Sequence, residues 1–436
     1  MGNFSNILKK ILLLLIFITL WFPIIQNKLS LFELEPLKGD NAIPAEVNLN
    51  ESSWWTADYQ KEQENYLNSM FGLRNFCVRL NNQIAYNIFN KAHAKDVVIG
   101  KEGYLFELNY IKAYNGSDCV GKDSINNVLN RLNFINDTLL KLKKNLIVVL
   151  APGKANYYPE YIPDEYLKNK SITNYQLFTE GAIKRDLNLI DFNKWFVENK
   201  NKSKYTLYPK HGIHWSIYGA LLSSDSLIKN IETHRNISMT HFNYKTFNLE
   251  PAHGDDYDIG GGMNLLSELK SENLAYPNME KMDSAGKTKP KVLVISDSFY
   301  WVMYGLGIAN CFDANHHVWY YNKQVYPESF TNEKLVSNLN FKEEINKYDV
   351  IIILATDNNL RNIGWGFAEN FERALKFNSN TNQKSERQIK IENLISYIKN
   401  DKQWVKDTKS RASEKNITLD SALVLEAMWQ IDHEKK

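Results

Sequence analysis

The chain has 436 residues, of which 44% are hydrophobic and 23% are charged, values that are ordinary for a globular protein with one large or two medium domains. Its 52 Lys and Arg residues are balanced by 50 Asp and Glu residues, for a net charge of +2. This balance argues against nucleic acid as a partner, because proteins that bind it usually carry a strong basic excess.

The N-terminus predicts a membrane segment. Lys9 and Lys10 precede an apolar run from Ile11 to Ile25, and a positive flank of this kind keeps the N-terminus inside and sends the rest across the membrane. No small-x-small cleavage site follows Ile25. We therefore expect residues 1–26 to form an uncleaved anchor, with a cleaved signal peptide as the alternative. In both cases the remaining chain lies outside the cytoplasm.

The rest of the chain divides into a tether, a helical segment, an alternating region and a tail. Residues 27–53 contain Pro36, Gly39 and Pro44 and are typical of a tether, whereas apolar residues recur at helical spacing over 57–92. Strands are then predicted at 97–99, 104–107, 146–150, 189–192, 292–295, 318–321 and 350–354, and helices at 122–143, 173–186, 216–231 and 331–346. The first two strands form a predicted hairpin. The alternation indicates an α/β fold with a parallel sheet covered on both faces by helices, and the charged residues 385–436 predict a helical C-terminal extension.

One strand ends in a candidate nucleophile. The apolar run from Lys291 to Ile295 leads into Ser296-Asp297-Ser298, and ligand sites of open α/β sheets gather at the carboxyl ends of strands. Ser298 is a nucleophile if an imidazole accepts its proton, and His214 is the candidate base. The alternative roles are a helix cap for Ser298 and a buried core position for His214. His211 is the nearest alternative base, although we expect it to face solvent.

Three further residues are candidates for supporting roles. Asp297 is expected to be a cap or a buried hydrogen-bond acceptor rather than a catalytic acid. Asn359 follows the strand 350–354, where its amide would help the backbone N–H of Ser298 to stabilise an oxyanion or would cap a turn. Lys154 follows another strand end and is either a surface lysine or a partner for an anionic substrate or a carboxylate of the site.

Six sequence blocks, taken in order, resemble a known family. They are YLNSMFGLRN at 66–75, VVIGKEGYLF at 97–106, PGKANYYPEYIP at 152–163, YPKHGIHWSIYG at 208–219, ISDSF at 295–299 and NNLRNIGWGF at 358–367. Their order and spacing are similar to those of the SGNH-hydrolase-like domain of the alginate O-acetylation proteins AlgX and AlgJ. The resemblance implies an SGNH-hydrolase-like domain over residues 54–375, with Ser298 as nucleophile and His214 as general base.

The resemblance also exposes a departure from the family pattern. The family usually carries an Asp two residues before the catalytic histidine, and this chain has Gly212 there. The missing carboxylate would hold the imidazole tautomer and stabilise its charged form. Asp191, at the end of a predicted strand, and Asp258, in a glycine-rich segment at 253–262 that we expect to be a flexible loop, are candidates for the third acid. Asp255 and Asp256 in the same loop are further alternatives.

The resemblance implies a protein of the cell envelope, anchored in the inner membrane or secreted to the periplasm, that acetylates an exported polysaccharide. The acetyl donor would be a membrane-bound acyltransferase, because no acetyl-CoA is expected outside the cytoplasm. The alternatives are a non-catalytic subunit that binds polysaccharide or assembles an export complex, and a plain esterase. No cofactor or metal is expected, since the glycine triplet at 260–262 lacks a dinucleotide-binding context and the acidic loop lacks the EF-hand pattern.

Overall fold

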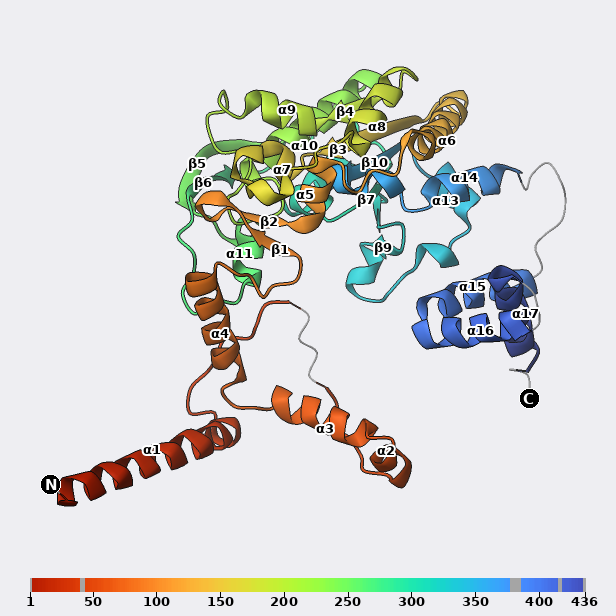
Figure 1. Ribbon diagram of the computed structural model, residues 1–436. Helices are drawn as coiled ribbons and strands as arrows, with labels where there is room; N and C mark the ends of the chain where they lie inside the picture. Colours follow the sequence, from red (N-terminus) through yellow and green to blue (C-terminus); the bar gives the residue numbers. More distant parts are fainter. Residues whose placement is uncertain (1, 40–43, 377–385, 415–417, 434–436) are drawn as a thin grey trace. The chain divides into compact units, whose positions relative to one another are not determined.

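The computed structural model describes residues 2–39, 44–376, 386–414 and 418–433, and the chain forms two compact units, Met1–Glu372 and Arg373–Lys436 (Figure 1). Residues 40–43 of the expected tether, and residues 385, 415–417 and 434–436 of the expected extension, lie outside the described residues. The functional residues predicted from the sequence all belong to the first unit.

A six-stranded sheet organises the first unit, in the order β4-β3-β10-β7-β8-β9. The strands are β3 (Asn145–Ala151), β4 (Leu189–Asp191), β7 (Val292–Ser296), β8 (His317–Tyr320), β9 (Gln324–Tyr326) and β10 (Val350–Thr356). The predicted α/β class and parallel pairing are confirmed for the first five strands in this order. The edge strand β9 was not predicted, and it runs antiparallel to β8, so the sheet is mixed. Three residues are too few to produce a periodic signal.

Helices cover both faces of this sheet. The side chains of β7 and β10 are buried along the whole of both strands, and successive side chains of a strand point to opposite faces. On one face, alternate residues of the central strands join a hydrophobic cluster with α9 (Phe192–Asn199), α10 (Ile217–Arg235) and α12 (Phe299–Gly305). Each fully buried Val, Ile or Leu contributes about 1.5–3 kcal/mol, so the carboxyl edge of the sheet is a rigid support.

The remaining helices and strands frame this core. The helices are α5 (Leu108–Asn115), α6 (Lys122–Lys141), α7 (Lys154–Tyr157), α8 (Asn174–Ile183), α11 (Asp258–Gly262), α13 (Phe341–Asn346) and α14 (Phe367–Lys376). Two antiparallel pairs lie outside the main sheet: β1 (Val97–Ile99) with β2 (Leu105–Glu107), as predicted, and β5 (Tyr244–Pro251) with β6 (Asn273–Met279). The second pair was not predicted, because most of β5 is exposed and lacks an apolar alternation.

Two predicted helices are shorter than expected. The segment 57–92 contains α3 (Asp58–Ser69) and α4 (Arg74–Phe89), separated at Gly72. A Cβ on Gly72 would lie 2.2 Å from the carbonyl oxygen of Pro23, so this break lets two backbone segments approach closely. The segment 331–346 contains α13 only from Phe341, because the Asn340 side chain accepts from the backbone N–H of Glu343 and caps the helix there.

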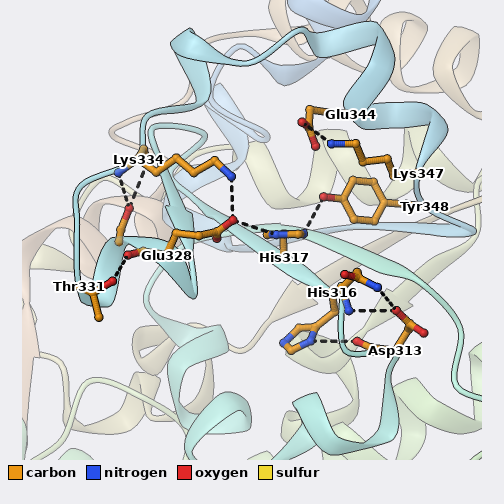
Figure 2. Close-up of polar contacts among 11 residues, drawn as sticks. Asp313, His316, His317, Glu328, Thr331, Lys334, Glu344, Lys347 and Tyr348 are labelled. Atoms are coloured by element: carbon orange, nitrogen blue, oxygen red, sulfur yellow. Dashed lines mark hydrogen bonds and ion pairs between the residues drawn. The ribbon is translucent and has the colours of Figure 1, made fainter.

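A row of polar side chains holds the β9 edge of the sheet. Figure 2 shows His317 of β8 between Glu328 and Tyr348, with Nδ1 2.9 Å from the Tyr348 hydroxyl and Nε2 3.2 Å from Glu328 Oε1. Lys334 donates to the same carboxylate at 2.7 Å. Because Glu328 and Lys334 follow β9 and Tyr348 precedes β10, this row joins the turn after β9 to the interior of the sheet.

Both ends of the chain are helical. Near the N-terminus, α1 (Gly2–Leu29) contains the stretch Asn6–Leu29, which is long and apolar enough to cross a membrane. A short helix, α2, covers Glu51–Trp55. In the second unit, α15 (Glu386–Asn400), α16 (Lys402–Glu414) and α17 (Leu419–His433) pack around a small apolar cluster that includes Ile398 and Leu423.

Candidate active site

Ser298 lies in the turn between β7 and α12. Its backbone is helical (φ −64°, ψ −18°), and its side chain makes no capping hydrogen bond to α12. Instead, Ser298 Oγ lies 2.9 Å from His214 Nε2. The structure therefore brings together two residues that are 84 positions apart in the sequence, and the hydroxyl contacts an imidazole rather than the helix backbone.

His214 lies in a loop that is fixed from several sides. Ser216 caps α10 by accepting from the backbone N–H of Gly219 at 3.0 Å, and the Tyr208 hydroxyl donates to the backbone oxygen of Ile213. Lys154 Nζ donates to the backbone oxygens of Lys210, at 2.8 Å, and Gly212, at 2.5 Å. These contacts order the backbone on both sides of the imidazole, so that its ring can face Ser298.

Asp258, the first residue of α11, provides the carboxylate behind this ring. Its Oδ2 lies 2.8 Å from His214 Nδ1, and its Oδ1 accepts from the backbone N–H of Ile213 at 2.8 Å. The carboxylate thus holds both the imidazole and the backbone next to it. With Nδ1 donating to Asp258, Nε2 of the neutral ring is left to accept a proton from Ser298.

The environment raises the pKa of His214 above its ordinary value of 6.5. Burial alone opposes the charged imidazolium, but the hydrogen bond and the negative charge of Asp258 outweigh it, with smaller contributions from Asp255 and Asp297. A base with a raised pKa accepts a proton more readily, and the nearby carboxylates stabilise the imidazolium that forms.

The absence of a side chain at position 212 is explained by the backbone of the segment that carries Asp255 and Asp256. A Cβ at this position would lie 2.8 Å from the backbone oxygen of Asp256 and 2.9 Å from that of Asp255. The space that a side chain would need is therefore filled by the segment that delivers Asp258. This segment is not the flexible loop that we expected, because it forms a 3-10 helix at Gly254–Tyr257 followed by α11.

Asp297 accepts four hydrogen bonds. They come from the backbone N–H of Phe299 at 3.1 Å, the backbone N–H and hydroxyl of Thr356 at 2.9 and 3.0 Å, and Asn359 Nδ2 at 2.9 Å. Burial raises the pKa of Asp297, while these donors oppose that rise. The carboxylate therefore joins the end of β7 to the end of β10 and fixes the turn that carries Ser298.

The expected role of Asn359 as a direct oxyanion donor needs correction. Its Nδ2 donates to Asp297 and, at 3.1 Å, to the hydroxyl of Thr356, so both amide hydrogens are engaged. The neighbouring Asn358 also lines the site and was not predicted. The sequence could have indicated Asn358, because it precedes Asn359 in the short segment that follows β10.

The structure also fixes the positions of two other candidates, and it excludes the surface position that was one alternative for Lys154 and the solvent-facing position expected for His211. Lys154 is fully buried rather than at the surface, and burial lowers its pKa to about 7 against the opposing charges of Asp258, Glu272 and Glu107. His211 is buried as well, and burial followed by the charges of Lys154 and Lys210 lowers its pKa to about 4. It is therefore not a solvent-facing base.

Asp191 is not the third acid. Its side chain caps α9 by accepting from the backbone N–H of Lys194 at 2.9 Å and also accepts from the Tyr175 hydroxyl at 2.7 Å. One carboxylate oxygen thus caps α9, and the other holds Tyr175 of α8. Of the candidates, Asp258 is the one that contacts His214.

A cavity of about 440 Å³ opens onto Ser298 and His214, within the range of about 300–1,000 Å³ that is usual for small-molecule sites. It is lined by Ala94, Val97, Glu107, Asn109, Tyr110, Ile213, His214, Asp258, Ile259, Gly262, Asp297, Ser298, Tyr321, Asn358 and Asn359. Sequence reasoning missed Glu107, Asn109, Tyr110 and Tyr321. Tyr321 directly follows β8, so the rule that sites gather at carboxyl ends of strands would have found it.

Within the described ranges, no group of three or more His, Cys, Asp and Glu side chains is arranged to hold a metal ion.

The fold and this geometry define a class: an α/β domain of the SGNH-hydrolase-like type, with a serine at the carboxyl end of a central strand. The sequence model of the family described as "SGNH hydrolase-like domain, acetyltransferase AlgX" matches residues 97–289. This part of the chain is therefore similar to the AlgX family of SGNH hydrolase-like domains, which is the resemblance that the sequence blocks predicted. The match includes His214 and Asp258 and ends before Ser298.

Three solved structures are similar to this chain. The O-acetyltransferase domain of Pseudomonas putida AlgJ has 18% identity and a TM-score of 0.41, over 61% of this chain and 92% of that one. Pseudomonas aeruginosa AlgX has 14% identity and a TM-score of 0.40, over 63% and 67%. Bacillus cereus PatB1 with a sulfonyl adduct has 15% identity and a TM-score of 0.40, over 63% and 99%. Similarity at this level says nothing about activity. No curated protein matches the chain.

Proposed function

We propose that this protein is a serine-dependent O-acetyltransferase that acts on an exported cell-surface polysaccharide. The observation that carries the proposal is the continuous row from Ser298 through His214 to Asp258, with distances of 2.9 and 2.8 Å, at the wall of an open cavity. The family whose sequence model matches residues 97–289 is described as an acetyltransferase family, which supports the same reaction.

In the first half of the reaction, Ser298 takes the acetyl group from its donor. Ser298 Oγ attacks the acetyl carbonyl carbon while its proton moves to His214 Nε2. The tetrahedral intermediate then collapses, the bond to the leaving oxygen breaks, and that oxygen takes the proton from His214. The products are the acetylated serine and the free donor alcohol, and His214 is again neutral.

In the second half, a sugar hydroxyl takes the place of the donor. His214 accepts the hydroxyl proton as the sugar oxygen attacks the acetyl-serine carbonyl, and the bond to Ser298 Oγ breaks as that oxygen takes the proton back. Asp258 stabilises the imidazolium in both halves and stays ionised. Water in place of the sugar would give plain hydrolysis, so the cavity has to orient the acceptor.

The negative oxygen of each intermediate needs donors near Ser298. The backbone N–H of Ser298 is one candidate, because it lies at the strand-to-helix turn. The side chain of Asn358 is a second, because it lines the cavity while the amide hydrogens of Asn359 are directed at Asp297 and Thr356. Loss of one such donor typically costs about 10²–10³ in kcat.

The N-terminal helix supports a location for the reaction outside the cytoplasm. The stretch Asn6–Leu29 is suited to anchor the protein in the inner membrane, with the globular units in the periplasm. The donor would then be a membrane-bound acyltransferase that delivers acetyl groups across the membrane. A cleaved signal peptide with a periplasmic product is the alternative for the same helix.

The competing proposal of a non-catalytic assembly subunit depended on Gly212, where the family pattern has an acid. The contact of Asp258 with His214 supports the enzyme instead, because it supplies a carboxylate to the imidazole from another segment. We therefore retain the subunit only as the outcome that the following experiment would reveal.

The test is acetyl transfer in vitro. Purified full-length protein in detergent is incubated with 4-nitrophenyl acetate and an oligosaccharide, and the sugar is analysed by mass spectrometry. We expect acetylated sugar from the wild type and from Ser226→Ala, a control on an exposed serine of α10, and none from Ser298→Ala. Release of acetate without acetylated sugar would identify an esterase, and no turnover at all in folded protein would favour the assembly subunit.

A further inference from the structure

The cavity beside Ser298 is lined by carboxylates. Glu107 at the end of β2 and Asp258 at the start of α11 both contribute to the wall, and Asp297 lies behind the nucleophile. Asp258 contacts His214, and Asp297 is held by neutral donors. Glu107 is not needed for either arrangement, so the mechanism described above leaves its presence unexplained.

No basic side chain balances these groups within the wall. The described residues that line the cavity include no Lys and no Arg, and His214 is their only group that can become cationic. Glu107 takes part in none of the ion pairs found among the described residues. The nearest buried cation is Lys154, which lies outside the cavity lining and donates to two backbone oxygens of the 210–212 loop.

The titration of Glu107 reflects the same negative field. Burial raises the pKa of Glu107, the charge of Asp258 raises it further, and His214 and the hydrogen bond from Asn109 oppose the rise only in part. The negative charge of Asp258 therefore already acts on a carboxylate at this wall. An anionic group brought in by a substrate would meet the same repulsion and would also lose its hydration.

We propose that the acceptor is a neutral or amino sugar and that Glu107 excludes uronic acids from the cavity. This inference rests on the proposed function, since it concerns the sugar that receives the acetyl group from Ser298. The other polar residues of the wall, among them Asn109 and Tyr321, are neutral and suit a hexose hydroxyl, whereas a uronate meets no Lys or Arg there. Like-charge juxtaposition of this kind is a common way to reject a wrong partner.

The experiment measures binding, so that it does not depend on turnover. Ser298→Ala protein is titrated by calorimetry with three matched oligosaccharides, built of glucose, glucuronate and glucosamine. We expect the glucose and glucosamine forms to bind about tenfold or more tightly than the glucuronate form at low salt. High salt should reduce this difference, because it screens charges.

Paired variants then assign the effect to a residue. Adding Glu107→Gln should reduce the preference against glucuronate several-fold. Adding Glu102→Gln, at an exposed carboxylate of the same hairpin that does not line the cavity, should leave the preference unchanged. If the protein with Glu107→Gln fails to fold, the effect of salt on the binding preference of the Ser298→Ala protein tests whether charge repulsion excludes glucuronate.

Equal or tighter binding of glucuronate overturns the inference, and so does the absence of binding by all three oligosaccharides. An unchanged preference in folded Glu107→Gln protein overturns the assignment to Glu107. The proposed function fails separately, through the wild type: it is refuted when 4-nitrophenyl acetate leaves no acetyl group on Ser298, whatever the sugars do.

Discussion

Two histidines in this protein have the same pair of neighbours, and only one of them lies at a candidate active site. His214 lies between the carboxylate of Asp258 and the hydroxyl of Ser298, and His317 lies between the carboxylate of Glu328 and the hydroxyl of Tyr348 (Figure 2). The distances in the two rows overlap: 2.8 and 2.9 Å around His214, and 3.2 and 2.9 Å around His317. A carboxylate–imidazole–hydroxyl row is therefore not evidence of catalysis by itself.

The surroundings of the two rows differ in three ways. Ser298 lines a cavity of about 440 Å³, whereas Tyr348 is buried and is not among the residues that line it. Burial raises the pKa of the Tyr348 hydroxyl well above its ordinary value, so this hydroxyl stays protonated and serves as a hydrogen-bond donor. Burial raises the pKa of Glu328, but the contact with Lys334 at 2.7 Å, a backbone hydrogen bond and the charges of His317 and Lys334 together outweigh burial and lower it. The row around His214 is therefore suited to exchange a proton with a ligand, whereas the row around His317 holds an edge strand.

The largest difference between the rows is expected when each loses its hydroxyl. Ser298→Ala should lower turnover of an acetyl ester by at least about 10⁴-fold, because it removes the hydroxyl that contacts the His214 base. Tyr348→Phe should leave turnover within about twofold, since Tyr348 is not a cavity residue. Steady-state kinetics of both variants test this, with circular dichroism as the control for folding. Ser298→Ala that keeps wild-type turnover would place the chemistry elsewhere.

Loss of the carboxylate should also separate the rows, with a pH signature. Asp258→Asn should lower kcat about 10²–10⁴-fold. In the wild type, the raised pKa of His214 means that activity falls with decreasing pH from a point above 6.5, as the base becomes protonated. In the variant, burial remains and Asp258 no longer opposes it, so the residual activity should persist to lower pH.

The matched control is Glu328→Gln, which should leave the pH profile unchanged. The measurement is kcat/KM as a function of pH for the three proteins. An acid limb that stays in place in Asp258→Asn would show that Asp258 does not control the protonation of His214.

A third prediction concerns why the acid reaches His214 from position 258. Gly212→Ala should reduce the free energy of unfolding by about 1–3 kcal/mol, because its Cβ would press against the backbone oxygens of Asp255 and Asp256. The same substitution at Gly305, where a Cβ meets nothing within 4 Å, is the control and should change stability far less. Urea unfolding of the two variants measures the difference, and equal stabilities would contradict the tight packing at Gly212.

The smallest effect is expected in the structural row. Lys334→Met removes an ion pair between half-exposed side chains, so the free energy of unfolding should fall by no more than about 1 kcal/mol. Turnover should be unchanged, because Lys334 does not line the cavity. Thermal unfolding and an ester assay on the same preparation check both statements. A loss of activity without a loss of stability would mean that the two rows are coupled.

How far the sequence predicted this structure depends on the kind of signal each feature leaves. Long buried strands such as β3, β7 and β10 leave continuous apolar runs, and their carboxyl ends directed attention to Ser298. The β9 strand has only three residues, and much of β5 is exposed, so neither left a clear pattern. The fold class and the five parallel strands were therefore predictable, whereas β9 and the β5–β6 pair were not.

The site divides in the same way. Ser298 and His214 were found from motifs, whereas the choice of Asp258 over Asp191 depends on which backbone fills the space beside Gly212. The position of Lys154 was left open and that of His211 was wrong, because a sequence does not reveal that a charged or titratable side chain is enclosed by packing. Glu107 was missed because it lies at the end of a short hairpin strand that carries no catalytic motif.

The most direct test of the central claim is the mass of the protein during turnover. Full-length protein is mixed with 4-nitrophenyl acetate, quenched with acid within seconds, digested and analysed by tandem mass spectrometry. The account predicts an acetyl group on Ser298 in the wild type, none at this position in His214→Ala, and slower accumulation in Asp258→Asn. Folded wild-type protein that turns over the ester but carries no acetyl group on Ser298, or carries it on another residue, would contradict it.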